Sequence, residues 1–181
     1  HNAMITRNNI DGLKEEEYLE RLENENNKIE ISEYKSDNQK EILLPTVETY
    51  SFTGNNLCEL IGGKIYVNPM LFFANNENPF KQEVREYPVD FGYPFADKYN
   101  ITIKIPEGFV VETLPESAII NMQDDLGSFK FNIAKNENIL QMTISHQINS
   151  AIVSTQQYEM LKEYYKGMIA KETEKIVLKR I

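Results

Sequence analysis

The segment that decides the fold is Phe129–His146, which reads FKFNIAKNENILQMTISH. Apolar side chains occupy every second position in two runs, and the turn-forming residues Asn136–Asn138 separate the runs. The first row consists of Phe129, Phe131 and Ile133, and the second row consists of Leu140, Met142 and Ile144. This alternation is typical of two antiparallel strands that bury one face and expose the other to water.

The same period of two recurs from Ile29 to Ile148. Ile101, Ile103 and Ile105 alternate with polar residues before the turn Pro106-Glu107-Gly108. Two further runs, Leu57–Ile61 and Lys64–Val67, flank Gly62-Gly63. A glycine pair accepts positive φ at both turn positions and so predicts a tight hairpin. Short alternating strands with turn signals between them favour a mainly β fold, an antiparallel β-sandwich.

A surface helix is expected before the strands. Glu15–Glu17 would occupy its first turn, where carboxylates complement the exposed amide groups. Its apolar stripe is narrow and consists of Tyr18, Leu19 and Leu22. We therefore divide the chain into an expression scar and start (residues 1–4), a helical connector from a preceding domain (residues 5–28) and a β-sandwich domain (residues 29–181).

A second helix is expected near the C-terminus. Ser154 and Gln157 have the spacing of a capping box, and Val153 can pack on Tyr158 one turn into the helix. The apolar face that follows consists of Tyr158, Leu161, Tyr165, Met168 and Ile169. A face this broad predicts a helix that packs on the sandwich. The tail Ile176–Leu178 predicts a last strand, which is stable only if it joins an existing sheet.

Composition excludes several classes of function. The 181 residues are 41% hydrophobic and carry 19 basic and 28 acidic side chains, a net charge of −9. Such a chain repels phosphate backbones, so we expect no nucleic-acid partner. We expect no membrane span and no signal peptide, because the apolar runs are short. One cysteine and two histidines exclude disulfide frameworks and Cys/His zinc sites.

Catalytic signals are weak. Cys58 and His146 are the only nucleophile–base candidates, and Cys58 falls inside a predicted strand, where no helix dipole lowers a thiol pKa. We interpret Cys58 as a small buried thiol and His146 as an imidazole at the edge of the core. Asp124-Asp125 lacks the alternating oxygen donors of a calcium loop and is read as a turn. We therefore predict no catalytic residue, no cofactor and no metal site.

An aromatic segment stands out at Arg85–Tyr99, which reads REYPVDFGYPFADKY. Its rings fall on odd positions, at Tyr87, Phe91, Tyr93, Phe95 and Tyr99. An extended chain would present them on one side. The rings could pack over the core of the sandwich, form a docking face for another domain, or bind a glycan or small molecule. The docking hypothesis assigns the binding role to Arg85, Tyr87, Phe91, Tyr93, Phe95 and Tyr99.

This segment and several other motifs resemble one family. The motifs are Gly12–Leu19, Asn78-Pro79-Phe80-Lys81, Arg85–Pro94, Ile105–Gly108 with Leu114-Pro115-Glu116, Leu126–Phe129, and the tail from Tyr158 to Arg180. Together they resemble the C-terminal domain of unknown function of bacterial transglutaminase-like proteins, which have a papain-type core. The family's nucleophile opens a helix, whereas Cys58 is expected in a strand, so no catalytic residue carries over.

The resemblance implies a function and a location. A parent protein would place a β-rich domain and a Cys-His-Asp catalytic domain before this one, in the periplasm or cell envelope. This chain would then be a non-catalytic accessory domain that docks on the catalytic domain or presents substrate to it, with a homodimer as a further expectation. The rivals are a carbohydrate or peptidoglycan module that uses the Tyr87–Tyr99 aromatics and a free-standing hydrolase that uses a pair of carboxylates.

Overall fold

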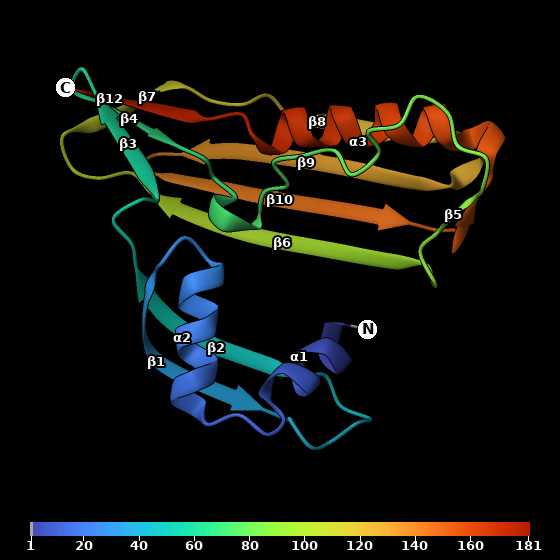
Figure 1. Cartoon of the computed structure of the whole chain (residues 1–181). Coiled ribbons are helices and arrows are strands. Elements are labelled where there is room, and N and C mark those ends of the chain that lie inside the picture. Colours follow the sequence, from blue (N-terminus) through green and yellow to red (C-terminus); the bar gives the residue numbers. More distant parts are fainter. Residues whose placement is uncertain (1) are drawn as a thin grey trace. The chain divides into compact units, whose positions relative to one another are not determined.

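A computed structural model describes residues 2–181, so His1 of the expected scar lies outside the described residues. The chain forms two compact units, His1–Leu57 and Cys58–Ile181 (Figure 1). Each unit is described by itself below. The strands β1 and β2 lie in the first unit, and the domain boundary expected after residue 28 stays a prediction.

The first unit consists of two helices and a hairpin. Its elements are α1 (Asn2–Ile10), α2 (Glu15–Glu25), β1 (Glu30–Asp37) and β2 (Val47–Thr53). Helix α2 begins at the acidic turn that the sequence predicts, and Tyr18 is its buried residue. The Tyr18 hydroxyl donates to Glu48 Oε1 at 2.8 Å, and the Tyr34 hydroxyl donates to the same oxygen at 2.7 Å. This shared carboxylate joins the helix to the hairpin.

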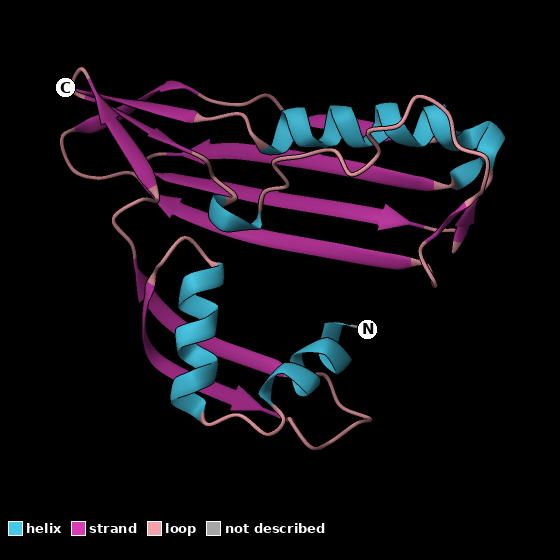
Figure 2. Ribbon diagram, in the orientation of Figure 1, coloured by secondary structure: helices cyan, strands magenta, loops and turns pink. Residues whose placement is uncertain are grey.

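The second unit is built on a four-stranded antiparallel sheet (Figure 2). Its strands are β6 (Phe95–Lys104), β8 (Ala118–Asn121), β9 (Gly127–Asn136) and β10 (Ile139–Ile148), in the order β6-β10-β9-β8. Met142 on β10 lies opposite Ile101 on β6 and Ile133 on β9. The inward rows predicted from the alternation are therefore confirmed, and the opposite face carries polar side chains such as Thr143.

A second four-stranded antiparallel sheet packs on this one. It consists of β3 (Cys58–Ile61), β4 (Lys64–Val67), β12 (Ile176–Arg180) and β7 (Phe109–Thr113), in that order. The predicted hairpin at Gly62-Gly63 is confirmed, with φ of 59° and 77°. A buried cluster joins the two sheets and consists of Ile105, Leu140, Ile176 and Leu178. The predicted last strand is thus confirmed as an inner strand of this sheet.

Helix α3 (Tyr158–Glu172) covers the rest of the inner face of the first sheet (Figure 1). The expected capping box is present, and Gln157 Oε1 accepts from the Ser154 amide at 3.2 Å. The buried face of the helix consists of Tyr158, Leu161, Tyr164, Tyr165, Met168 and Glu172. A mainly β fold with antiparallel sheets, an N-terminal helix and a packing C-terminal helix is therefore confirmed. The short strands β5 (Val89–Asp90) and β11 (Ile152–Val153) pair beside the first sheet.

The C-terminal segment should be essential for the second unit. Deletion of residues 154–181 removes α3 and also β12, which lies between β4 and β7. We expect the shortened chain to lose the cooperative thermal unfolding of this unit. Leu161→Ala, at a fully buried position, should lower the free energy of unfolding by about 2–5 kcal/mol.

The matched control is Val84→Ala, because Val84 is 80% exposed in the same unit. Its effect on the free energy of unfolding should stay within about 0.5 kcal/mol. Urea denaturation followed by circular dichroism measures both values. A soluble, cooperatively melting deletion variant would show that the core lies elsewhere.

Candidate functional site

The segment from residue 68 to residue 94 connects β4 to β6 and is held along α3. Glu172 Oε2 accepts from the Asn75 amide at 2.8 Å and from Asn75 Nδ2 at 2.9 Å. Burial raises the pKa of Glu172, and the two bonds from Asn75 oppose that rise. Asn78 Nδ2 donates to the Lys162 carbonyl at 2.9 Å, and Lys162 Nζ donates to the Gln82 carbonyl at 2.9 Å. These bonds fix a long segment that has little regular structure of its own.

Phe80 anchors this segment in an aromatic cluster. Its ring centroid lies 4.9 Å from Tyr165, 6.0 Å from Tyr158 and 6.3 Å from Phe91, all in edge-to-face geometry. Edge-to-face pairs contribute about 0.5–1.5 kcal/mol each beyond the area they bury. The Arg85 guanidinium lies 5.7 Å from the Tyr158 ring, which adds a cation–π contact. Contacts of Phe80 and Arg85 therefore hold the segment in place on both sides of residues 81–84.

His146 extends the cluster into the first sheet, at the edge-of-core position that the sequence predicts. Its ring lies 5.3 Å from Phe95, 5.5 Å from Tyr165 and 5.8 Å from Tyr164. Its Nε2 is buried and has no hydrogen-bond partner among the described residues. Burial lowers the pKa of His146, and the nearby Asp97 carboxylate opposes this shift. Burial likewise raises the pKa of Tyr165 to about 12. The imidazole is thus held neutral inside an aromatic shell.

The six residues of the docking hypothesis divide into an outer and an inner group. Tyr87 is 74% exposed and Tyr93 is also exposed. The inner group packs against the core or beneath the segment: Phe91 and Phe95 lie 5.8 Å apart, Tyr99 lies 5.7 Å from Phe73, and Arg85 lies over Tyr158. The structure therefore leaves two of the five rings open to solvent while the other three support the segment from inside.

The segment is extended only in part. Phe95 and Tyr99 lie on β6 and face the core, as alternation requires. Before them the chain turns at Gly92, whose φ of 78° favours glycine. The Gly92 amide donates to Asp90 Oδ1 at 2.7 Å, which closes this turn. Odd spacing alone therefore does not place Tyr87 and Tyr93 beside the rings of β6.

Sequence reasoning missed two contributors to this region. Val84 is 80% exposed and lies close in sequence to the exposed Tyr87. The second is Phe80, which anchors the middle of the segment and whose motif carries no sign of this packing. The string Asn78-Pro79-Phe80 offers a signal, because Asn78 Oδ1 accepts from the Phe80 amide at 2.9 Å in a local turn. Long-range packing of Phe80 on α3 has no such local signal.

The prediction of a buried Cys58 thiol is wrong. Cys58 is exposed, because β3 is an edge strand whose inner side extends beyond the packed part of the sheet. Cys58 lies opposite Val67 in the second sheet, whereas His146 lies opposite Asp97 and Phe129 in the first. The thiol and the imidazole therefore belong to different sheets. Within residues 2–181 no group of three or more candidate ligands could hold a metal ion.

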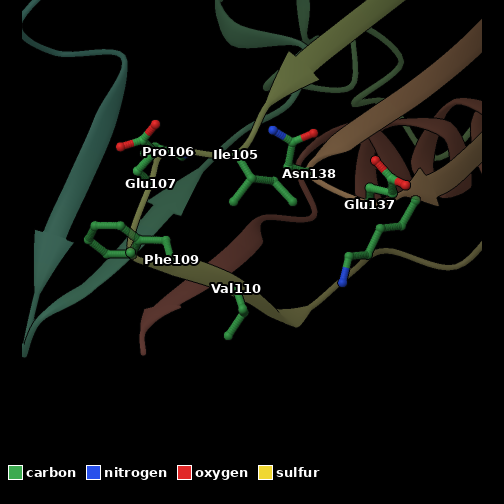
Figure 3. Close-up of a pocket in the computed structure, with 9 residues that line it drawn as sticks. Ile105, Pro106, Glu107, Phe109, Val110, Glu137 and Asn138 are labelled. Atoms are coloured by element: carbon green, nitrogen blue, oxygen red, sulfur yellow. The ribbon is translucent and has the colours of Figure 1, made fainter.

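A shallow pocket of about 230 Å³ lies where the turn Pro106-Glu107-Gly108 meets the β9–β10 turn (Figure 3). Phe109 and Val110 form its apolar part. Glu107 and Glu137 lie at opposite ends of the pocket in Figure 3 and are exposed. The general acid of a glycosidase lies in an environment that shields its carboxyl group from water. With both carboxylates exposed at opposite ends, this pocket does not provide such an environment.

Sequence comparison identifies the family of the second unit. Residues 63–178 match the family model described as a domain of unknown function with a solved structure, DUF3858. The chain belongs to the DUF3858 family. The matched range contains the aromatic segment, both sheets apart from β3 and the last two residues of β12, and all of α3. The family description assigns no activity, and the link to a transglutaminase-like parent stays a prediction.

One solved structure is similar to the DUF3858 chain, a protein from Parabacteroides distasonis described as a "putative protease". The two are 11% identical with a TM-score of 0.47, over 54% of this chain and 19% of that protein. Similarity at this level transfers no activity. No curated protein shows a significant match. None of the helices described between residues 2 and 181 has the length and apolar character needed to cross a bilayer.

The buried His146 should make the second unit sensitive to acid. Its pKa is lower in the folded chain than in the unfolded chain, so its neutral form stabilises the fold above about pH 6.5 and that stability is lost as the pH falls. The slope for one proton reaches about 1.4 kcal/mol per pH unit. We expect His146→Phe to reduce this slope when urea denaturation is compared at pH 7.5 and pH 5.5.

Three titratable groups face or lie near the imidazole: Asp97 from β6, and Tyr164 and Tyr165 from α3. Both tyrosines stay neutral across this range, because burial raises the pKa of each. The raised pKa of Glu172 acts in the opposite direction, since its protonation in acid favours the fold. Glu172 is present in both proteins, so the difference between them isolates His146. Equal slopes would contradict the prediction.

Proposed function

We propose that the chain is a non-catalytic accessory domain that docks on the catalytic domain of a transglutaminase-like protein. The observation that carries the proposal is an exposed aromatic and aliphatic tip on a tethered segment. Tyr87 and Val84 are 74% and 80% exposed, and they lie between the anchors Phe80 and Phe91. Protein interfaces favour aromatic residues at their centres, because these bury a large area with few rotatable bonds.

The tethering of the tip supports a docking role. A loop that must become ordered on binding loses conformational entropy, and prior ordering removes part of that cost. Here Lys162 Nζ and the Tyr158 hydroxyl both donate to the Gln82 carbonyl, at 2.9 and 3.1 Å. Arg85 is held over Tyr158 directly after the exposed Val84. The exposed residues are thus presented by a backbone that is already fixed.

The absence of catalytic function is part of the proposal. A nucleophile needs a base within hydrogen-bond reach and a group that orients the base. Cys58 and His146 lie in different sheets, and among the described residues no hydrogen-bond partner orients His146 Nε2. A cell-envelope or periplasmic location is proposed from the family resemblance alone, together with the parent protein.

A second candidate is a carbohydrate or peptidoglycan module, favoured by one observation. Tyr87 and Tyr93 are exposed rings on one short segment, with Pro88 and Pro94 beside them. Exposed aromatic faces suit the apolar faces of sugar rings. The two candidates differ in their ligand, so titration with chitohexaose or a soluble peptidoglycan fragment separates them from docking on a protein.

Docking should depend on the tip. In a titration of a separately produced transglutaminase-like catalytic domain from the parent with this chain, Tyr87→Ala should raise the dissociation constant at least about tenfold, or 1.4 kcal/mol. Isothermal titration calorimetry measures the effect. Ile119→Ala is the control, because Ile119 is 63% exposed on β8, away from the tip in sequence.

The expected result is loss of affinity for Tyr87→Ala alone, with unchanged thermal unfolding of both variants. No binding by the unaltered chain, or equal binding by all three proteins, would contradict docking. Binding of chitohexaose that weakens in Tyr87→Ala and Tyr93→Ala would instead support the carbohydrate module.

The isolated chain should be catalytically inert. Assays with a glutamine donor and an amine acceptor, and with a casein substrate, should give no turnover above a buffer blank. Any residual signal should be equal in the unaltered chain and in Cys58→Ala, since a contaminating enzyme does not depend on this thiol. Turnover that disappears in Cys58→Ala would refute the accessory role.

A further inference from the structure

Strand β3 forms one edge of the second sheet (Figure 1). It pairs with β4 without a register shift, and all four of its residues are exposed. Natural edge strands are protected by short length, charged side chains, proline or a β-bulge. Strand β3 is short and carries one charged side chain, Glu59, but it contains no lysine, proline or β-bulge. The opposite edge strand, β7, has a register shift against β12 at Val177/Leu178. The β3 edge is therefore a template for another strand.

The side chains of β3 continue the core row of the sheet. In register, Leu60 lies opposite Ile65, and Ile65 lies opposite Leu178, which is buried between the two sheets. Leu60 itself is 72% exposed and its neighbour Ile61 is 57% exposed. Burying Leu60 would therefore extend an existing hydrophobic cluster and remove exposed apolar area from water.

The geometry of the β3–β4 hairpin determines which backbone groups of β3 can bond to an added strand. In a two-residue hairpin the flanking pair, here Ile61 and Lys64, is hydrogen-bonded. Backbone groups along a strand alternate in direction, so those of Glu59 and Ile61 point to β4. The amide and carbonyl groups of Cys58 and Leu60 therefore point away from the sheet, at its open edge.

Charge favours a second copy of the chain as the occupant of this edge. The chain carries a net charge of −9, which opposes association of two copies in general. The second sheet differs, because its strands hold two carboxylates and three cations: Glu59, Glu112, Lys64, Lys179 and Arg180. Glu59 is also neutralised by Lys175 Nζ at 2.7 Å. Charge repulsion between two copies is therefore small at this sheet.

We propose that β3 pairs antiparallel with β3 of a second copy about a two-fold axis at Leu60. An axis at Leu60 uses its outward backbone groups for a hydrogen-bonded pair and places the two leucines side by side. It also places Ile61 opposite Glu59 of the second copy, which avoids opposing carboxylates. The same surface serves both copies, as closed two-fold symmetry requires. This inference is independent of the docking tip at Tyr87.

The first test is the oligomeric state of the full chain over a range of concentrations, measured by sedimentation equilibrium. We expect a monomer–dimer equilibrium for the unaltered chain. Leu60→Lys should raise the dimer dissociation constant at least about tenfold, because it removes apolar contact and places two cations at the axis. Leu43→Lys is the matched control, since Leu43 is 97% exposed in the first unit and should leave the equilibrium unchanged.

The second test locates the axis by oxidation. In a Cys58→Ser background, Leu60→Cys should form a disulfide-linked dimer, because directly opposite residues have Cα atoms about 5.5 Å apart, within disulfide range. Leu43→Cys in the same background should remain monomeric under non-reducing electrophoresis. Thermal unfolding of each variant checks that the fold is kept.

Concentration-dependent dimers that weaken in Leu60→Lys and cross-link through Leu60→Cys support the proposal. An unaltered chain that stays monomeric at every concentration overturns it. So does a dimer that survives Leu60→Lys, that dissociates only in Leu43→Lys, or that fails to cross-link through residue 60.

Discussion

The long segment of the second unit depends on the packing of Phe80 against helix α3. The segment from residue 68 to residue 94 has few backbone bonds of its own, so side chains must hold it in place. Phe80 contacts Tyr158 and Tyr165 of the helix edge-to-face, and Phe91 of the same segment. If Phe80 left this position, the hydrogen bonds of Asn78 and Gln82 to the helix would lose their alignment. Phe80 thus holds the middle of this 27-residue segment, and the buried Met70, Ala74 and Val89 anchor it nearer its ends.

The anchored segment exposes two apolar side chains. Phe80 and Phe91 turn inward, and Val89 between them is buried as well. Val84 and Tyr87 lie in the same stretch but on the surface. They are thus held on a backbone that is anchored on both sides of them. An exposed apolar side chain on a fixed backbone is costly in water and well prepared for a partner, which is the physical basis of the proposed docking role.

Much of the β structure could be predicted from the sequence, because alternation with a period of two reports the buried face directly. The rows through Phe131 and Ile144 and the turn at Gly62-Gly63 follow from local pattern. The position of a strand within its sheet, at an edge or inside, does not follow from local pattern. Cys58 is a small apolar residue in a predicted strand, yet β3 lies at an edge and leaves it exposed. The aromatic segment of the candidate site could be recognised from the sequence. The packing of Phe80 on α3 could not, because it joins residues far apart in the chain.

His146 shows how the fold can use a catalytic residue type for packing. Alternation along β10 requires an inward side chain at this position, between Ile144 and Ile148. The neutral imidazole fills it as a ring, at 90° to Phe95 and 89° to Tyr165. A general base needs a substrate proton within reach of a nitrogen and a group that orients the ring. Here Nε2 is enclosed by aromatic carbon, and the Tyr164 hydroxyl beside it is likewise buried without a partner among the described residues. Leaving such polar atoms unpaired costs about 1–3 kcal/mol each, a cost that packing of the surrounding rings offsets. His146 therefore belongs to the same aromatic cluster as Phe80, since both rings pack on Tyr165, and it contributes to the stability of the second unit.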